Sequence, residues 1–93
     1  MSRLTQNERD RFVAAAPGWT VAGESIAKTY SLADFNAALG FVVRLGILAE
    51  IADHHPDIDI RWNKVTLTLS THDEDALTEK DTRLAMAIDA LEG

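Results

Sequence analysis

The 93-residue sequence carries 15 Asp and Glu residues against 9 Lys and Arg residues, giving a net charge of −6, and it contains no cysteine. An acidic chain without a basic stripe is a poor partner for nucleic acid or for an anionic membrane surface. The absence of cysteine excludes disulfides, thiolate metal sites and a cysteine nucleophile.

The length predicts one domain over residues 1–93, large enough for a hydrophobic core and small enough to gain stability from association. The residues from Met1 to Gln6 are too polar for a signal peptide. We expect that no apolar run reaches the length of a membrane span. We therefore expect a cytoplasmic protein that does not enter a membrane.

Thr5 and Glu8 have the spacing of a capping box, which predicts a first helix to about Ala15. Pro17 and Gly18 end that helix. The alternating residues from Trp19 to Tyr30 then predict a hairpin with its turn near Gly23 and Glu24.

Ser31 and Asp34 form another cap pair, which predicts a helix to about Ala52, roughly 20 residues long. Gly40 and Gly46 each cost about 1 kcal/mol in a helix interior, which close packing would offset. One side of this helix is expected to pack on a sheet and the rest to meet another subunit, because apolar residues occupy most of its circumference. These residues are Phe35, Ala38, Leu39, Phe41, Val42, Leu45, Leu48, Ala49 and Ile51.

A second hairpin is predicted after this helix, with Asn63 and Lys64 as its two-residue turn. This register places apolar residues on one face and polar residues on the other. The expected apolar pairs are Trp62 with Val65, Ile60 with Leu67, and Ile58 with Leu69. Extended to the open end of the hairpin, the same register sets His55 opposite His72.

An acidic, solvated loop follows from His72 to Ala76, and Thr78 then caps a last helix. The apolar stripe of that helix comprises Leu84, Ala85, Ile88 and Leu91. The predicted order is helix, two strands, helix, two strands, helix. This order indicates the α+β class, a single antiparallel four-stranded sheet with helices packed on one face.

All three histidines of the chain, His54, His55 and His72, meet at the open end of the second hairpin in this interpretation. Histidine exchanges protons near neutral pH, and a positioned proton donor or acceptor contributes roughly 10² to 10⁴ in rate. A single histidine at a strand end is usually only a tolerated polar residue, but three at one place favour acid/base chemistry.

Metal binding and nucleophilic catalysis are less favoured. His54 and His55 would point to opposite sides of an extended backbone, and no H-x-x-x-H or H-E-x-x-H spacing occurs. A triad containing Ser70 and His72 would place the serine in mid-strand rather than on a nucleophile elbow.

Three carboxylates are further candidates for the site, and the sequence signal for each of them is weaker than that for the histidines. Glu50 would share a helical face with His54, and Asp53 adjoins the histidine pair. Asp81 lies three residues after Thr78, where capping alone would justify it. Trp19 and Trp62 are more typical of a core than of a ligand platform.

Several of these segments together resemble the pterin-4a-carbinolamine dehydratases, a family whose vertebrate members also serve as dimerization cofactors of a homeodomain transcription factor. The matching segments are Glu50-Ile-Ala-Asp53-His54-His55-Pro56, Trp62-Asn63-Lys64-Val65, Leu69-Ser70-Thr71-His72 and Leu77-Thr78-Glu79-Lys80-Asp81. The resemblance extends from Trp19 to the C-terminus. Trp62 and Ile58 depart from the tyrosine and the aromatic residue of many members.

The resemblance implies dehydration of 4a-hydroxytetrahydropterins, formed by aromatic amino acid hydroxylases, to the quinonoid dihydropterin, with no metal and no organic cofactor. It makes His54 and His72 the proton-transfer candidates, His55 a contact to the pterin ring, and Asp81 the residue that orients a histidine. Glu50 and Asp53 would accept from the pterin amino and ring N–H groups. The remaining substrate-binding candidates in the matched region are Pro56, Ser70, Thr71 and Trp19.

The resemblance also implies partners: a small-molecule pterin, and further copies of the chain in a homo-dimer or homo-tetramer built through sheet extension and helix bundling. Two other functions stay open. One is a pterin-binding or protein-binding regulatory module with incidental catalysis, and the other is a purely structural oligomer.

Overall fold

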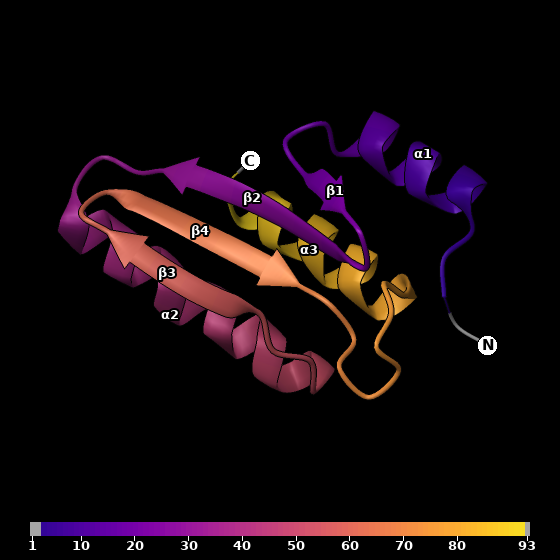
Figure 1. Cartoon of the computed structure of the whole chain (residues 1–93). Helices are drawn as coiled ribbons and strands as arrows, with labels where there is room; N and C mark the ends of the chain where they lie inside the picture. The colour runs from indigo at the N-terminus through magenta and orange to yellow at the C-terminus, as the bar shows by residue number, and fades with distance from the viewer. Residues whose placement is uncertain (1–2, 93) are drawn as a thin grey trace.

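Three helices and four strands make up the chain in the predicted order α-ββ-α-ββ-α (Figure 1). The computed structural model describes residues 3–92. Its elements are α1 (Gln6–Ala15), β1 (Thr20–Ala22), β2 (Ser25–Ser31), α2 (Phe35–Ala52), β3 (Asp57–Arg61), β4 (Lys64–Leu69) and α3 (Glu79–Glu92). The strands form one antiparallel sheet in the order β1-β2-β4-β3, so the predicted α+β class is confirmed.

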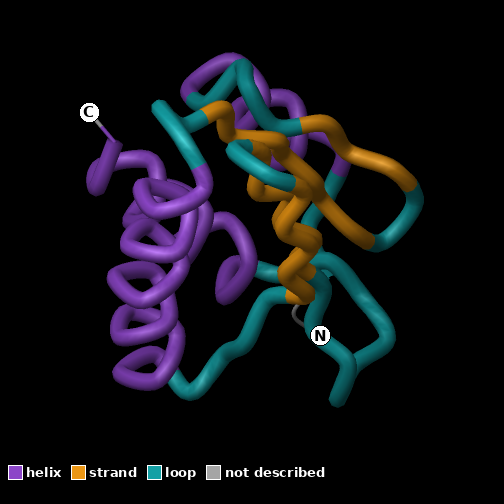
Figure 2. Tube along the Cα trace, turned by 90° about the vertical axis from the view of Figure 1, so that its left-hand side faces the viewer, coloured by secondary structure: helices purple, strands orange, loops and turns teal. Residues whose placement is uncertain are grey.

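Helices α2 and α3 lie side by side on one face of the sheet, whose other face they leave uncovered (Figures 1 and 2). The period of two in β4 explains this arrangement, because Val65, Leu67 and Leu69 point into the core while Thr66 and Thr68 face outward. The largest fully buried side chains include Phe41 and Leu45 of α2 and Ile88 of α3. Burial of these apolar side chains is the main stabilising contribution.

Helix α1 begins with the predicted capping box: the Thr5 hydroxyl accepts from the Glu8 amide, and the Glu8 carboxylate accepts from the Thr5 amide. The first hairpin is also confirmed. Ala22 pairs with Ser25 around a turn at Gly23 and Glu24. Gly23 has a φ of +59°, which glycine adopts without the penalty of a side chain.

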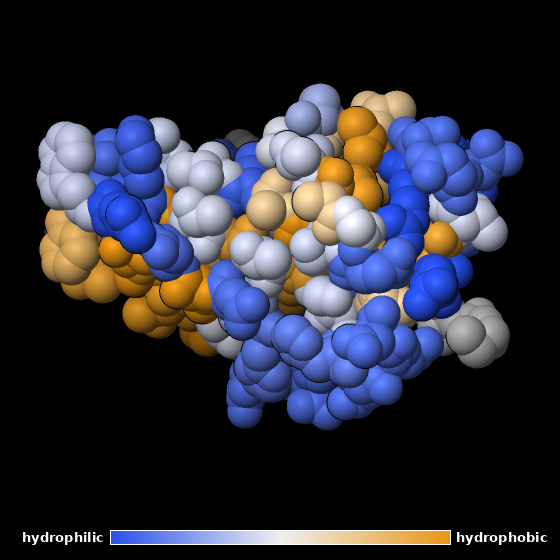
Figure 3. Space-filling view, viewed as in Figure 1, coloured by the Kyte–Doolittle hydropathy of each residue, from blue (hydrophilic) through white to orange (hydrophobic). Residues whose placement is uncertain are grey.

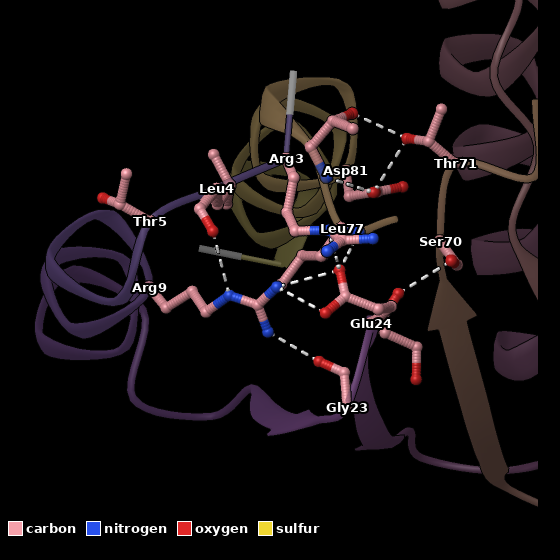
Figure 4. A network of polar contacts seen from close by, with 12 residues as sticks. Arg3, Leu4, Thr5, Arg9, Gly23, Glu24, Ser70, Thr71, Leu77 and Asp81 are labelled. Atoms are coloured by element: carbon pink, nitrogen blue, oxygen red, sulfur yellow. Dashed lines mark hydrogen bonds and ion pairs between the residues drawn. The ribbon is translucent and has the colours of Figure 1, made fainter. Parts of the chain in front are cut away.

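Glu24 connects this hairpin to the segments that flank β4 (Figure 4). Its carboxylate accepts two bonds of 2.9 Å from the Arg9 guanidinium and one of 3.0 Å from the Leu77 amide. Its carbonyl oxygen accepts from the Ser70 hydroxyl at 2.7 Å. The Leu77 amide, followed by Arg9, lowers the pKa of Glu24. These contacts fix both ends of the loop between β4 and α3.

The N-terminus of α2 differs from the expectation. Asp34 is the N-cap, its carboxylate accepting from the Ala37 amide at 2.8 Å. Ser31 is the last residue of β2 and pairs with Lys64, so its backbone belongs to the sheet and it caps nothing. The helix therefore has 18 residues.

The apolar surface of α2 is only partly used within the chain. Its buried residues are Ala38, Phe41, Leu45 and Ala49, whereas Phe35, Leu39, Val43, Ile47 and Ile51 are exposed. Hydrophobic surface follows the lower left of the molecule, over α2 (Figure 3). A Cβ added at Gly40 or Gly46 would meet no atom within 4 Å, so the close packing expected at these glycines is not made within one chain.

By length and composition α2 is also long and apolar enough to cross a membrane, which corrects the expectation that no apolar run has that length. The same criterion is met by core helices of soluble proteins, and α2 packs on the sheet here.

The second hairpin forms, but its register is shifted by two residues from the predicted one. Arg61 pairs with Lys64, so the turn residues are Trp62 and Asn63, and Ile60 faces Val65. Trp62 has a φ of +52° and is 68% exposed, so its assignment to the core is wrong. A two-residue shift keeps every strand residue on its face, which is why the hydrophobic pattern did not distinguish the two registers.

Asn63 explains the choice of turn. Its side-chain amide donates to the Leu32 carbonyl at 2.9 Å, and its own carbonyl accepts from the Leu32 amide at 2.8 Å. Both bonds attach the turn to the connection between β2 and α2. With this anchor Asn63 is the second residue of the turn, whereas the prediction made it the first.

Asp89 attaches α3 to the sheet. Its carboxylate accepts from Trp19 Nε1 at 3.1 Å, from Lys28 Nζ at 2.8 Å and from the Tyr30 hydroxyl. Burial alone would raise the pKa of Asp89, but the bonds from Lys28, Tyr30 and Trp19 outweigh it and the pKa is lowered. Burial and the bond to Asp89 raise the pKa of Tyr30.

We predict that Asp89→Asn lowers the free energy of unfolding at pH 7 by about 1–3 kcal/mol, because three donors lose a charged acceptor. A carboxyl group with a lowered folded-state pKa stabilises the fold above its unfolded pKa of about 4 and loses this contribution as the pH falls further. Urea unfolding at pH 7 and pH 3 should therefore give a smaller difference between variant and parent at pH 3. Asp57→Asn, at an exposed position, is the control and should change stability by less than about 0.5 kcal/mol. A pH-independent loss would contradict the assignment.

Candidate functional site

The C-terminal end of α2 fixes the backbone of His54. Asp53 adopts the left-handed conformation, with φ 51° and ψ 44°, and donates its amide to the Glu50 carbonyl. The His54 amide then donates to the Ala49 carbonyl at 3.1 Å. This pair of bonds is a Schellman motif, in which Asp takes the place usually held by Gly. His54 is therefore held in place directly after the helix.

The His54 ring is fixed by Asp81 of α3. Nε2 of His54 lies 2.5 Å from Oδ1 of Asp81, and the two side chains are 11% and 0% exposed. Because a carboxylate only accepts, Nε2 must carry the proton in this bond. Nδ1 is then the ring nitrogen available for proton exchange.

The second oxygen of Asp81 is occupied as well (Figure 4). It accepts from the Thr71 hydroxyl at 2.9 Å and from the Thr78 amide at 3.0 Å. With the Thr71 proton used in this way, the Thr78 hydroxyl donates to Thr71 Oγ1 at 2.6 Å and accepts from the Lys80 amide at 3.2 Å. Thr78 thus caps α3 as predicted, and the buried polar groups form one satisfied network.

A short, closed loop presents His72. Thr71 and Ala76 exchange amide–carbonyl bonds of 3.0 and 3.3 Å, and Asp75 has a φ of +53°. The residues between them are exposed, and this loop forms part of the hydrophilic surface at the bottom of Figure 3. His72 follows Thr71 directly, so the buried network also fixes the base of its side chain.

A pocket of about 190 Å³ lies between these segments. Its lining residues are Asp53, His54, His55, Ser70, Thr71, His72, Asp73 and Lys80. All three histidines therefore border one pocket, but not through the predicted strand ladder. Strand β3 begins at Asp57 and β4 ends at Leu69, so neither His55 nor His72 is paired in the sheet.

The other residues predicted for the site do not all line this pocket. His55 Nε2 lies 2.7 Å from a Glu50 carboxylate oxygen, but His55 is 58% exposed and Glu50 does not line the pocket. Pro56 is also outside the lining. Trp19 is 2% exposed, donates to Asp89 and belongs to the core. Lys80 lines the pocket and was missed; its position directly before Asp81 was the available signal.

Two further pockets lie nearby. One of about 400 Å³ is bounded by His54 and Lys80 and by apolar residues of α2 and α3, among them Leu48, Ile51, Leu84 and Ala87. Another, of about 620 Å³, lies on the polar open face of the sheet. Within residues 3–92, no group of three or more His, Cys, Asp or Glu side chains has the geometry to hold a metal ion.

Residues 2–91 match the family described as pterin 4 alpha carbinolamine dehydratase. The chain belongs to this family. A protein of Chloroflexus aurantiacus named "Putative pterin-4-alpha-carbinolamine dehydratase" is 50% identical over 93 residues, which cover 100% of both chains. One of Roseiflexus castenholzii with the same name is 58% identical over 88 residues, covering 95% of each.

Solved structures agree with this assignment. A transcriptional coactivator/pterin dehydratase from Brucella melitensis superposes with a TM-score of 0.92 at 35% identity, covering 98% of this chain and 99% of that one. A pterin dehydratase-like RuBisCO assembly factor of the alpha-carboxysome gives a TM-score of 0.67 at 24% identity, covering 81% and 87%. The second likeness concerns the fold alone.

We predict that the neutral His54 ring is the Nε2–H tautomer, because Asp81 accepts from that nitrogen. Two-dimensional ¹H–¹⁵N NMR of the imidazole nitrogens measures this directly. Asp81→Ala should populate both tautomers and lower the free energy of unfolding by about 1–3 kcal/mol, because buried donors lose their acceptor. Asp73→Ala, in the exposed loop, should change neither quantity. An Nδ1–H tautomer in the parent protein would contradict the hydrogen-bond assignment.

Proposed function

We propose that this protein dehydrates 4a-hydroxytetrahydropterins to quinonoid dihydropterins by histidine acid/base catalysis, recycling the cofactor of aromatic amino acid hydroxylases. The observation that carries the proposal is the convergence of three histidines on one pocket, with His54 held by a buried carboxylate. Membership of the pterin 4 alpha carbinolamine dehydratase family supplies the substrate class.

The reaction requires two proton transfers. The C4a–O bond breaks as a proton is delivered to the leaving oxygen, water departs, and a proton is removed from N5 as the N5=C4a double bond forms. One acid and one base suffice, and a histidine serves in either role near neutral pH. No metal or organic cofactor enters this scheme. His54 and His72 are the proposed pair.

The contacts of His54 suit proton transfer. Asp81 holds Nε2–H, leaves Nδ1 free, and would stabilise the imidazolium that forms when Nδ1 takes up a proton. His72 lies on the exposed loop and lines the same pocket, so it is the second candidate for proton transfer with a bound ligand. This arrangement pairs one fixed histidine with one more solvated histidine.

The remaining lining residues are proposed to bind the pterin. His55 would contact the ring, and Asp53 would accept from the amino and ring N–H groups, with Glu50 assisting from the surface through His55. The hydroxyl of Ser70 donates to the Glu24 carbonyl, which leaves its oxygen free to accept from the ligand. Trp19, buried elsewhere, has no part in this proposal.

We predict that His54→Ala and His72→Ala each reduce the dehydration rate by roughly 10² to 10⁴ while the fold is retained. Stopped-flow absorbance with a freshly generated 4a-carbinolamine, corrected for spontaneous dehydration, measures the rate. His55→Ala is the matched control and should raise KM more than it lowers kcat. Parental turnover in both the His54 and His72 variants would exclude them as the proton-transfer pair.

A homo-oligomer is the second part of the proposal. The exposed stripe of α2, defined as Phe35, Leu39, Val43, Ile47 and Ile51, repeats every four residues along one side of the helix. Contiguous exposed apolar surface of this kind marks an interaction site. The open space over Gly40 and Gly46 would admit the backbone of a second helix, which supports a second copy of the chain as the occupant.

We predict that Val43→Glu and Ile47→Glu each convert the oligomer to a monomer, because a charge would be buried between the apolar stripes. Sedimentation velocity at micromolar concentration measures this change. Ala14→Glu, on the exposed side of α1, is the control and should leave the assembly unchanged. A parent protein that sediments as a monomer at all concentrations would contradict the oligomer.

The alternative is a regulatory module that binds pterin or protein without significant turnover. The exposed stripe favours it, and the Brucella protein of 35% identity is titled a transcriptional coactivator as well as a pterin dehydratase. Carbinolamine turnover separates the two functions: dihydropterin binding without dehydration above the spontaneous rate would support the module.

A further inference from the structure

Lys80 is the one Lys or Arg side chain among the residues that line the histidine pocket. The other charged residues of that lining are Asp53 and Asp73. Lys80 also borders the apolar pocket that His54 borders. Lys80 and His54 therefore line the same two pockets.

The backbone amide of Lys80 is hydrogen-bonded, whereas its ammonium group has no partner within residues 3–92. The amide donates to the Thr78 hydroxyl, and the next residue is the buried Asp81. Within residues 3–92, no hydrogen bond or ion pair engages Nζ of Lys80. By contrast, Arg83, one turn later, pairs with Glu79 at 2.7 Å. A group that is fixed at its base and free at its tip can bind a ligand without breaking an existing contact.

The helix dipole does not favour a cation at this position. Lys80 lies in the first turn of α3, where the helix dipole disfavours a positive charge by about 0.3–1 kcal/mol. Glu79 and Asp81 on either side conform to the rule that acidic residues are preferred there. The helix dipole therefore does not explain the positive charge at this position.

The pterin ring supplies the matching group. Its pyrimidinone edge presents the N3–H and 2-amino donors next to the C4 carbonyl, which is an acceptor. Asp53 can take the donors but cannot satisfy the carbonyl, because a carboxylate has no proton to give. An ammonium group can.

We propose that Lys80 donates a hydrogen bond to the C4 carbonyl oxygen and thereby selects 4-oxo pterins over 4-amino pteridines. This inference rests on the proposed pterin-binding function of the histidine pocket. C4 is bonded to C4a, the reacting carbon, so holding the carbonyl also positions C4a between His54 and His72. Lys80 is a substrate-positioning residue with no proton transfer of its own.

Two ligands that differ in the C4 substituent, and with it in the proton on N3, test this role: 7,8-dihydropterin and 2,4-diamino-7,8-dihydropteridine. Because Asp53 also senses the N3 proton, the part of the preference that Lys80→Met removes is the part assigned to Lys80. Isothermal titration calorimetry should show that the parent protein prefers the oxo ligand. Lys80→Met keeps the chain length and removes the charge, so it should weaken oxo binding about tenfold. The same variant should leave diamino binding nearly unchanged, and Lys80→Arg should restore the preference. Arg11→Met, at an exposed position of α1 that lines neither pocket, is the control and should behave as the parent.

Kinetics separate this inference from the proposed function. Lys80→Met should raise KM about tenfold with a smaller change in kcat. Equal loss for both ligands, an unchanged preference in Lys80→Met, or no oxo preference in the parent protein would overturn the inference. A parent protein that shows the Lys80-dependent preference but does not dehydrate a carbinolamine would support the inference and refute the enzymatic function.

Discussion

The buried carboxylate of Asp81 is the group on which the site depends. It has no exposed surface and is engaged by His54, Thr71 and Thr78, which lie after α2, after β4 and before α3. An unpaired charge in such a position would be strongly destabilising, so these three segments must converge on it. Their convergence creates the pocket. Helix capping and orientation of a histidine are one interaction here, because the same carboxylate serves both.

The fold was predictable where a local rule decided it. The capping box at Thr5 and Glu8, the turn at Gly23 and Glu24, and the Thr78 cap each follow from contacts within a few residues. The second hairpin shows the limit of such rules. Its alternating pattern is unchanged by a shift of two residues, and the register is chosen by Asn63 bonding to Leu32, 31 positions away in the sequence.

The residues around the candidate pocket were predicted in part, whereas the contacts that bring them together were not. The histidines meet because a Schellman motif directs His54 toward Asp81 and a closed loop carries His72, and the strand ladder does not reach either of them. The hydrogen bonds that join Asp81, Thr71 and Thr78 could not be recognised in the sequence, since threonine is common at strand ends and caps. Lys80 was overlooked because a single lysine beside acidic residues resembles an ordinary solvated surface.

Helix α2 connects the site to the unpartnered surface. Its buried residues pack on the sheet, and its C-terminal end sets the position of His54. Its exposed stripe ends at Ile51, which borders the same apolar pocket as His54. In a monomer, Gly40 and Gly46 each destabilise the helix by about 1 kcal/mol. No packing contact at these glycines offsets this cost within one chain. A second copy seated on the stripe would supply that contact and stabilise the helix as a unit. Self-association would then stabilise the end of the helix that carries His54, so that assembly and the geometry of the pocket are thermodynamically linked.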